Sequence, residues 1–325
     1  MNAGIVGSGK IVGECLRALG SLEHINAAAL CVRSCSEEKG RKLAEEHGIG
    51  KVYTDYDEFL EDDSLDIVYI GIINSLHFEY ARKALLRGKN VLLEKPMTTA
   101  SKEMRILEEL ALEKGLILME AITTLHYPVF HFVKEQIKKL GEIKLVQCNF
   151  SQYSSRYDRY LEGEVLPVFD PKLYGGTLYD INVYNLHFAA ALFGRPQKVH
   201  YQCNRGFNGV DTSGIVTLEY PGFLVECAAA KDSCSPCFGL VQGTKGYVRV
   251  NGSVSLCPEA EAVIGTERST SVCPEAGSRM CFEWEALYRM WKENDMAECQ
   301  RLLEHSVLVM ELLEAAREDA GLRLG

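Results

Sequence analysis

Up to about residue 120, short apolar runs alternate with segments that carry apolar residues at helical spacing. The apolar runs include Ala3–Val6, Ala27–Val32, Ile67–Ile73 and Val91–Leu93, and the helical segments include Ile11–Leu19, Glu37–His47, His77–Arg87 and Ser101–Lys114. Continuous apolar runs are typical of strands buried on both faces, and their alternation with helices indicates βαβ units. The pattern therefore predicts an α/β domain with a doubly wound parallel sheet over residues 1–122.

After about Pro128 the pattern changes to longer segments in which apolar and polar residues alternate. These segments are Ile143–Tyr153, Lys198–Arg205, Gly214–Tyr220, Leu224–Lys231 and Tyr247–Val250. Such alternation indicates strands buried on one face, and so a large, mostly antiparallel open sheet. Leu178–Leu192 has a helical pattern and Glu298–Glu318 is amphipathic. We expect an α+β domain over residues 123–325, with irregular edge strands and loops at 252–280 and a C-terminal helix near 298–320.

Composition narrows the class of protein. The chain has 325 residues, a formal net charge of -10 and twelve scattered cysteines. The negative charge disfavours nucleic acid and anionic membranes as partners, no apolar stretch is long enough to span a membrane, and the first strand begins too early for a signal peptide. We expect a cytoplasmic protein with reduced cysteines. Cys234-Ser-Pro-Cys237 has no second ligand pair, so we expect no metal site.

The segment from Gly4 to Gly13 has the pattern of a strand, a glycine-rich turn and a helix. Glycines let the backbone approach a pyrophosphate, and the first turn of the helix offers free N–H groups to it. We therefore assign to cofactor binding the residues Gly7, Ser8, Gly9, Lys10 and Ile11. Val12 stands where GxGxxG has its third glycine, which predicts looser packing of the helix on the strand. A tight turn without a ligand is the alternative.

The second strand ends in Arg33-Ser34 rather than in the acidic residue that would hold a ribose 2′-OH. An arginine at this position can accommodate a 2′-phosphate, which favours NADP as the cofactor, with NAD possible. Arg33 could equally stack on the adenine from the surface. We expect both Arg33 and Ser34 to contact the cofactor.

Glu94-Lys95-Pro96 follows the apolar run Val91–Leu93. Proline donates no ladder hydrogen bond and restricts the residue before it, so the strand ends here. Ligands bind at the carboxyl edge of open α/β sheets, and we expect Lys95 to lie at that edge. A solvated lysine at an ordinary strand end is the alternative.

Further motifs follow in a fixed order along the chain. They are Asn74-Ser75-Leu76-His77, Gly88–Pro96, Glu120-Ala121, Pro128 and Gly175–Tyr184. Together with the glycine-rich turn and Arg33-Ser34, this ordered set resembles the Gfo/Idh/MocA family of NAD(P)-dependent oxidoreductases over nearly the whole chain. The resemblance implies a Rossmann nucleotide-binding domain, a substrate-binding domain, and a homodimer or dimer of dimers formed through the open sheet of the second domain.

The resemblance also implies roles for single residues. In that family the lysine of Glu-Lys-Pro lies beside the nicotinamide, and an aspartate with a His or Tyr four residues later completes the site. These residues map onto Lys95, Asp180 and Tyr184, and the tyrosine resembles the glucose-fructose oxidoreductase and dimeric dihydrodiol dehydrogenase branches. Further residues expected on the cofactor side are Ile72, Asn74, His77 and Glu94. Residues expected to bind the substrate are Glu120, His126, Tyr153, Arg156, Tyr157, Asp180 and His187.

The chain departs from the family pattern at three places. Ile72-Ile73 stands where Thr-Pro is usual, and Leu125 lies near the position of a missing arginine. Both departures imply a changed substrate pocket or nicotinamide wall. Asn182 replaces a glycine between Asp180 and Tyr184, which only adjusts helix packing.

These residues suit hydride transfer between a nicotinamide and a hydroxyl-bearing carbon of a sugar, polyol or related compound. A neighbouring ammonium favours a phenolate, so Tyr184 could exchange the proton while Lys95 assists and Asp180 holds an adjacent hydroxyl or orients Lys95. The proton could instead pass through Lys95. Two other functions stay open: redox-neutral sugar chemistry with tightly bound NAD, and a non-catalytic sugar- or nucleotide-sensing regulator. A sensor has no need of the three proton-transfer groups together.

Overall fold

A computed structural model describes residues 1–275 and 278–323, which form two compact units. Residues 276–277 and 324–325, which belong to the expected loop region and second domain, lie outside the described residues. The first unit comprises Met1–Ile122 and Glu275–Val307, and the second comprises Thr123–Pro274 and Leu308–Gly325. The chain changes units after Ile122, and residues 275–307, which the sequence analysis placed in the second domain, belong to the first unit.

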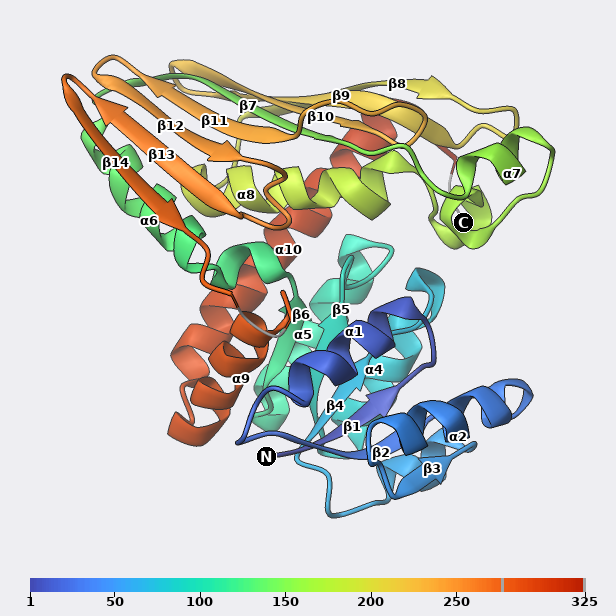
Figure 1. Cartoon of the computed structure of the whole chain (residues 1–325). Coiled ribbons are helices and arrows are strands. Elements are labelled where there is room, and N and C mark those ends of the chain that lie inside the picture. Colours follow the sequence, from blue (N-terminus) through green and yellow to red (C-terminus); the bar gives the residue numbers. More distant parts are fainter. Residues whose placement is uncertain (276–277, 324–325) are drawn as a thin grey trace. The chain divides into compact units, whose positions relative to one another are not determined.

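The first unit contains a six-stranded parallel sheet in the order β3-β2-β1-β4-β5-β6 (Figure 1). Its strands are β1 (Asn2–Val6), β2 (Asn26–Cys31), β3 (Lys51–Tyr53), β4 (Ile67–Ile70), β5 (Asn90–Glu94) and β6 (Leu118–Ala121). Every residue of β4 and β6 is buried, as expected for strands covered on both faces. The strand order reverses between β1 and β4, and sheets of this kind bind ligands beyond the carboxyl ends of those strands.

Six helices accompany this sheet. They are α1 (Lys10–Leu19), α2 (Glu37–Glu46), α3 (Tyr56–Leu60), α4 (His77–Leu86), α5 (Ser101–Lys114) and α9 (Cys281–Glu293). The sequence analysis did not predict α9, which packs against α1. Its Trp284 and Leu287 are fully buried, and the Trp284 ring lies 6.0 Å from that of Tyr69 in β4. Burial of such side chains contributes roughly 1.5–3 kcal/mol each, which explains why residues 275–307 join the first unit.

The second unit contains an eight-stranded sheet in the order β14-β13-β12-β11-β7-β10-β9-β8. Its strands are β7 (Ile143–Ser151), β8 (Lys198–Arg205), β9 (Asp211–Tyr220), β10 (Phe223–Ala230), β11 (Phe238–Gly243), β12 (Gly246–Asn251), β13 (Glu259–Ile264) and β14 (Glu267–Val272). Only β7 and β10 pair in parallel, so the predicted mostly antiparallel sheet is confirmed. The stretch expected to be irregular contains the regular hairpin of β13 and β14 at the sheet edge.

Helices cover one face of this second sheet. They are α6 (Pro128–Gln136), α8 (Val183–Phe193) and the C-terminal part of α10 (Met296–Asp319), while α7 (Tyr157–Leu161) lies beyond the end of β7 (Figure 1). From Ile215 to the end of β9 the buried side chains are Val216, Leu218 and Tyr220, which alternate with more exposed residues. No helix of the described residues covers the opposite face.

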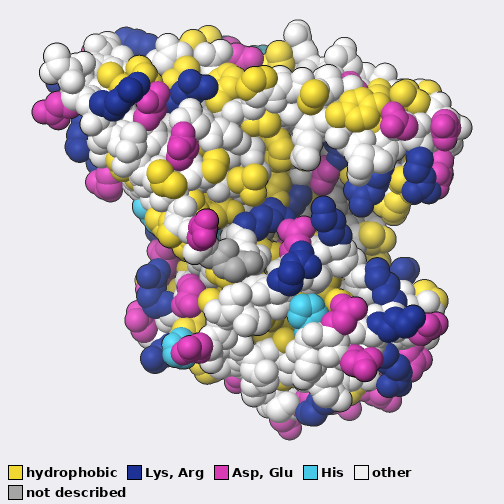
Figure 2. All heavy atoms as spheres, viewed as in Figure 1, with side chains coloured by type: hydrophobic (Ala, Val, Ile, Leu, Met, Phe, Trp, Pro, Cys, Tyr) yellow, Lys and Arg dark blue, Asp and Glu magenta, His cyan; other side chains and the backbone are white. Residues whose placement is uncertain are grey.

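Short helical turns complete the two units. The 3-10 turns are Ser34–Ser36, Asn74–Leu76, Thr123–His126, Ile137–Lys139, Pro167–Phe169 and Pro171–Leu173, and a π-helical turn spans Leu178–Asn182. None of the described helices has both the length and the apolarity needed to cross a membrane. Figure 2 shows acidic and basic side chains interspersed over the visible face, with hydrophobic side chains between them.

Candidate active site

The glycine-rich turn joins β1 to α1 at the reversal point of the parallel sheet. Gly7 has a φ of 116°, and a Cβ atom at this position would lie 2.4 Å from the carbonyl oxygen of Gly71. Only glycine fits both conditions. Gly9 caps α1 with no side-chain hydrogen bond to the helix, and a Cβ there would meet nothing within 4 Å. The first N–H groups of α1 therefore face open space, as a phosphate site requires.

Val12 packs tightly, contrary to the expectation from the missing third glycine. Its side chain is fully buried, and a Cβ on Gly71 would lie 3.0 Å from its Cγ2 atom. Gly71, at the end of β4, therefore supplies the space that a glycine at position 12 would have left. Helix α1 therefore still packs closely on the sheet, because the small residue stands at the end of β4 instead of on the helix.

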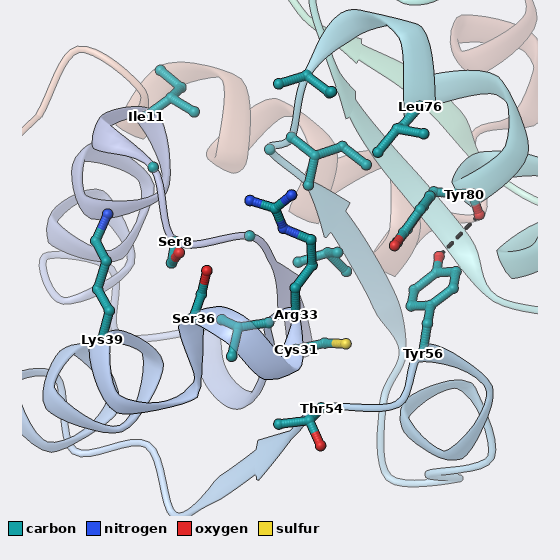
Figure 3. Close-up of a pocket in the computed structure, with 17 residues that line it drawn as sticks. Ser8, Ile11, Cys31, Arg33, Ser36, Lys39, Thr54, Tyr56, Leu76 and Tyr80 are labelled. Carbon is teal, nitrogen blue, oxygen red and sulfur yellow. Dashed lines mark hydrogen bonds between the residues drawn. The ribbon is translucent and has the colours of Figure 1, made fainter.

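A pocket of about 460 Å³ opens at this turn within the first unit (Figure 3). Of the predicted cofactor residues, its lining includes Gly7, Ser8, Gly9, Ile11, Arg33 and Ile72. Those not in the lining are Lys10, Ser34, Asn74, His77, Glu94 and Lys95. The pocket thus joins the ends of β1, β2 and β4, whereas the predicted cofactor residues Glu94 and Lys95 at the end of β5 are not in its lining.

Figure 3 shows Arg33 extending into the middle of the pocket, with Ser36 and Lys39 on one side and Tyr56 and Tyr80 on the other. Tyr56 donates a hydrogen bond of 2.9 Å to the carbonyl oxygen of Tyr80. Burial raises the pKa of the Tyr56 hydroxyl well above its usual range, so Tyr56 contributes an uncharged side chain to the lining of the pocket. Arg33 and Lys39 bring two positive charges to the end of β2.

Sequence reasoning missed Ser36, Lys39, Tyr56 and Tyr80. The signal for Lys39 was its place in the first turn of α2, directly after the strand that ends in Arg33. Tyr80 lies three residues after His77 on α4, so both fall on neighbouring positions of that helix. Tyr56 is the first residue of α3, and nothing in the sequence indicated that the start of this helix reaches the pocket.

Three side chains hold the turn that carries Lys95. The hydroxyl of Tyr69 donates to Glu94 Oε1 at 2.7 Å, the carboxylate of Glu120 accepts from the Met97 N–H at 3.1 Å, and His77 Nδ1 lies 2.9 Å from the Pro96 carbonyl oxygen. The bond between Lys95 and Pro96 is cis. Glu94 and Glu120 are buried while Lys95 is partly exposed. Lys95 is therefore the residue of this turn that is presented outward.

His77 was expected to contact the cofactor, but the structure encloses its side chain completely. Its two ring nitrogens lie against the carbonyl oxygens of Pro96 and Ile72, at 2.9 and 3.2 Å. Burial lowers the pKa of His77, and a neutral ring donates to one of these carbonyls. These contacts let the His77 ring fix the turn that carries Lys95. Glu94 and Glu120, both expected at ligands, likewise use carboxylate oxygens to hold backbone and Tyr69.

A buried acidic group lies behind this turn. Glu283 of α9 is fully buried, and among the described residues neither of its carboxylate oxygens has a hydrogen-bond partner. Burial, and after it the charge of Glu94, raises the pKa of Glu283 well above its usual range. Arg279, which pairs with Glu14 at 2.8 Å, opposes this shift. Burial of Glu283 therefore favours its protonated, neutral form.

Asp180 and Tyr184 occur where the π-helical turn Leu178–Asn182 runs into α8. Such turns are frequent at functional sites. The turn is anchored by Asp211, whose Oδ2 accepts from the Leu178 N–H at 2.6 Å. Asp180 forms an ion pair with Lys231, and Tyr184 is mostly buried with its ring 6.0 Å from that of Phe150. Sequence reasoning did not identify Lys231, which it treated only as a strand end.

The expected substrate segment is a polar loop that leads into α7. Tyr153 and Arg156 are exposed, and the Tyr153 hydroxyl donates to Asp158 at 2.5 Å. Tyr157 instead packs on the aromatic rings of Tyr160 and Phe169, with centroids 5.8 and 5.6 Å away. Tyr157 is therefore part of a packed aromatic cluster, which the sequence analysis did not predict.

The two other predicted histidines are both in the second unit. His126 ends the 3-10 turn Thr123–His126 and is partly exposed. His187 lies on α8 one turn beyond Tyr184 and is fully buried. The Nε2 atom of His126 is nevertheless buried, and His187 is part of the packing around α8.

Comparison with known proteins identifies both parts of the chain. The family model "Oxidoreductase family, NAD-binding Rossmann fold" matches residues 1–122, and the GFO/IDH/MocA C-terminal domain matches residues 130–249. The chain is 31% identical to scyllo-inositol 2-dehydrogenase (NADP(+)) of Bacillus subtilis, covering 98% of this chain and 96% of that protein. It is 30% identical to trans-1,2-dihydrobenzene-1,2-diol dehydrogenase of Sus scrofa, over 98% of this chain and 96% of that protein.

A solved structure supports the fold. Levoglucosan dehydrogenase in complex with NADH and levoglucosan superposes with a TM-score of 0.86 at 16% identity, over 99% of this chain and 97% of that one. The expected architecture and the expected family are both confirmed, because family models and full-length relatives agree with the two sheets. The chain belongs to the GFO/IDH/MocA family of oxidoreductases.

Proposed function

We propose that this protein transfers a hydride between NADP, or less favourably NAD, and a hydroxyl or carbonyl carbon of a sugar, a polyol or a related small hydroxy compound. The pocket at the reversal point of the parallel sheet carries the proposal, because a glycine turn, a helix N-terminus and Arg33 are what a dinucleotide requires. Relatives named for scyllo-inositol and for trans-1,2-dihydrobenzene-1,2-diol support the substrate class.

Preference for NADP is supported by the charges at the end of β2. Arg33, Ser36 and Lys39 all line the pocket, so a hydroxyl and two positive charges lie on the same side of it. A guanidinium and an ammonium suit a 2′-phosphate, whereas a free ribose 2′-OH would call for a carboxylate. A relative named for its use of NADP(+) supports the same choice.

Calorimetric titration with NADP+ and with NAD+ tests this cofactor assignment. Arg33→Ala is expected to weaken NADP+ binding by about 10- to 100-fold, the loss of one hydrogen-bonded ion pair, with little effect on NAD+. Arg41→Ala removes an exposed arginine that pairs with Glu37 on α2 and serves as the control. Tighter binding of NAD+ than of NADP+ by the unmodified protein would contradict the assignment.

The catalytic roles follow the chemistry of the three polar groups. We assign proton exchange to Tyr184, assistance and contact with the reacting oxygen to Lys95, and the binding of a neighbouring hydroxyl to Asp180. The rigid support of the Lys95 turn by Tyr69, His77 and Glu120 favours a positioning task for the ammonium. Residues proposed to contact the substrate are Tyr153, Arg156 and His126.

Steady-state kinetics of Lys95→Met and Tyr184→Phe test these roles. Each is expected to lower kcat by about 100-fold or more, because general acid–base contributions are of that size. Lys102→Met, an exposed lysine on α5, is the control and should leave kcat unchanged. Near-normal kcat in both Lys95→Met and Tyr184→Phe would remove the assignment.

We also propose that two copies associate through the uncovered face of the eight-stranded sheet. Ile215 and Leu224, on the adjacent strands β9 and β10, are 44% and 48% exposed, and exposed apolar side chains gathered on one face favour association. Light scattering of Leu224→Glu, with Leu86→Glu on α4 as the control, tests this. A monomeric unmodified protein would contradict the proposal.

A cytoplasmic location is our remaining proposal. The twelve cysteines all fall within the described ranges and are free, which suits a reducing compartment. Fractionation of cells that produce the protein tests this, and recovery with exported proteins would contradict it.

A further inference from the structure

Lys231 follows β10 and is almost completely enclosed. Its side chain is only 4% exposed, and its ammonium pairs with the carboxylate of Asp180, whose side chain is 35% exposed. A lysine is rarely buried to this extent unless it has a charged partner. The buried end of this ion pair is therefore Lys231, and the end that reaches the surface is Asp180.

The surroundings of Lys231 leave Asp180 as the acid that pairs with it. The Lys231 Nζ atom lies 5.3 Å from the centre of the Phe169 ring, which is a cation–π distance. Asp211 is also near, and its Oδ2 accepts from the Tyr201 hydroxyl at 2.7 Å and from the Leu178 N–H at 2.6 Å, while its buried Oδ1 has no hydrogen-bond partner among the described residues. These two hydrogen bonds fix Asp211 under the π-helical turn. The ion pair of Lys231 is nevertheless with Asp180.

Backbone hydrogen bonds connect Lys231 and the end of β10 to β9 and to the loop that follows β7. The Lys231 N–H donates to the Thr212 carbonyl oxygen at 2.8 Å, and its own carbonyl oxygen accepts from the Ser154 N–H at 2.9 Å. The Gln152 N–H donates to the Ala230 carbonyl oxygen at 2.9 Å. The loop that carries Tyr153 and Arg156 is thus tied to the residue whose side chain holds Asp180.

We infer that Lys231 is a positioning residue, which fixes the Asp180 carboxylate in its ionised form as an acceptor for a substrate hydroxyl. The inference rests on the function proposed above. A buried ammonium cannot be re-solvated without moving β10, so the carboxylate bound to it keeps one orientation. The pair carries no net charge, which suits a neutral polyol rather than a cationic substrate. Asp180 then accepts a hydrogen bond from the substrate and takes no proton from it.

Kinetics of four variants test the inference, with NADP+ and scyllo-inositol or D-xylose as the probe substrates. Lys231→Met is expected to lower kcat/KM by about 10- to 100-fold, the effect of losing the geometry of one catalytic contact. Lys231→Arg, which keeps the charge, should recover most of that loss. Asp180→Asn combined with Lys231→Met should be no slower than Asp180→Asn alone, because either change already breaks the pair.

Normal kcat/KM in Lys231→Met, or a double variant in which the two losses multiply, would overturn the inference. If Lys231→Met alone does not fold, the kcat/KM of Asp180→Asn is compared with that of the double variant. A further loss of kcat/KM in the double variant would then overturn the inference. Lys198→Met is the control, since it breaks an exposed ion pair with Glu219 in the same sheet.

Binding of NADP+ separates this inference from the proposed function. It should be unchanged in the Lys231 variants, because Lys231 does not line the pocket of the first unit. An unmodified protein that binds no nucleotide and turns over neither probe would count against the proposed function. Turnover that does not depend on Lys231 would count against the inference alone.

Discussion

Replacing Glu283 by glutamine is expected to raise the free energy of unfolding at neutral and alkaline pH and to leave it little changed in acid. The reason is the complete burial of Glu283, whose two carboxylate oxygens have no partner among the described residues. Burial and the nearby Glu94 charge raise its pKa well above the usual range. The folded protein therefore keeps a proton that the unfolded chain releases.

The sign and the size follow from proton linkage. Because the pKa of Glu283 is raised on folding, its stabilising effect is complete below about pH 4.3, the ordinary glutamate pKa, and is lost as the pH rises through the folded-state value. Within that window one extra bound proton costs the folded state about 1.4 kcal/mol per pH unit. Glutamine has the same shape and no such proton. The stability difference between Glu283→Gln and the unmodified protein should thus grow by about 1.4 kcal/mol per pH unit.

Urea unfolding at a series of pH values measures this difference. Glu285→Gln is a matched control, because Glu285 lies two residues along the same helix and is exposed. Its stability difference should not change with pH. If Glu283→Gln gave the same flat profile as Glu285→Gln, then Glu283 would be ionised in the folded protein and the argument from its burial would be wrong.

Three further perturbations test other parts of the first unit. Tyr69→Phe removes the 2.7 Å donor to buried Glu94 and should cost about 1–3 kcal/mol in urea unfolding, and an unchanged midpoint would show that the bond contributes nothing. Gly7→Ala, at a φ of 116° and with its Cβ 2.4 Å from an oxygen atom, should abolish measurable NADP+ binding in calorimetry, whereas Gly50→Ala, where a Cβ meets nothing within 4 Å, should not. Lys39→Met should weaken NADP+ binding by about 10-fold and leave NAD+ binding unchanged, and an equal loss for both nucleotides would argue against contact with a 2′-phosphate.

The fold could be predicted from the sequence where periodicity decides it. Continuous apolar runs such as Ile67–Ile73 and alternating ones such as Gly214–Tyr220 distinguish buried parallel strands from half-buried ones, and the two sheets follow. Helix α9 was missed because it follows a stretch rich in Ser, Pro and Gly, although its Trp284 and Leu287 are fully buried. Its return to the first unit depends on tertiary packing that no local pattern encodes.

The part of the candidate site that lies at strand ends could be predicted from the topology of the parallel sheet. Gly7 and Arg33 stand at strand ends, so the topology alone brings them to one pocket. Lys231 and Tyr56 reach their places through side-chain directions and loop paths, which spacing does not reveal. His77 was expected on the cofactor side, and its place against the carbonyl oxygens of Pro96 and Ile72 depends on the path of the Lys95 turn, which the sequence does not reveal.

The three supports of the Lys95 turn come from β4, α4 and β6, which are elements of the rigid core of the first unit. The backbone entropy of ordering that turn is therefore lost when the chain folds and not when a ligand binds. Little reorganisation of the surroundings is left for the moment of reaction, so changes at Tyr69, His77 or Glu120 should reduce the rate of turnover more than they reduce the affinity for either ligand. On the role proposed for Lys95, the hydrogen bonds that hold this turn in the fold would also lower part of the activation barrier.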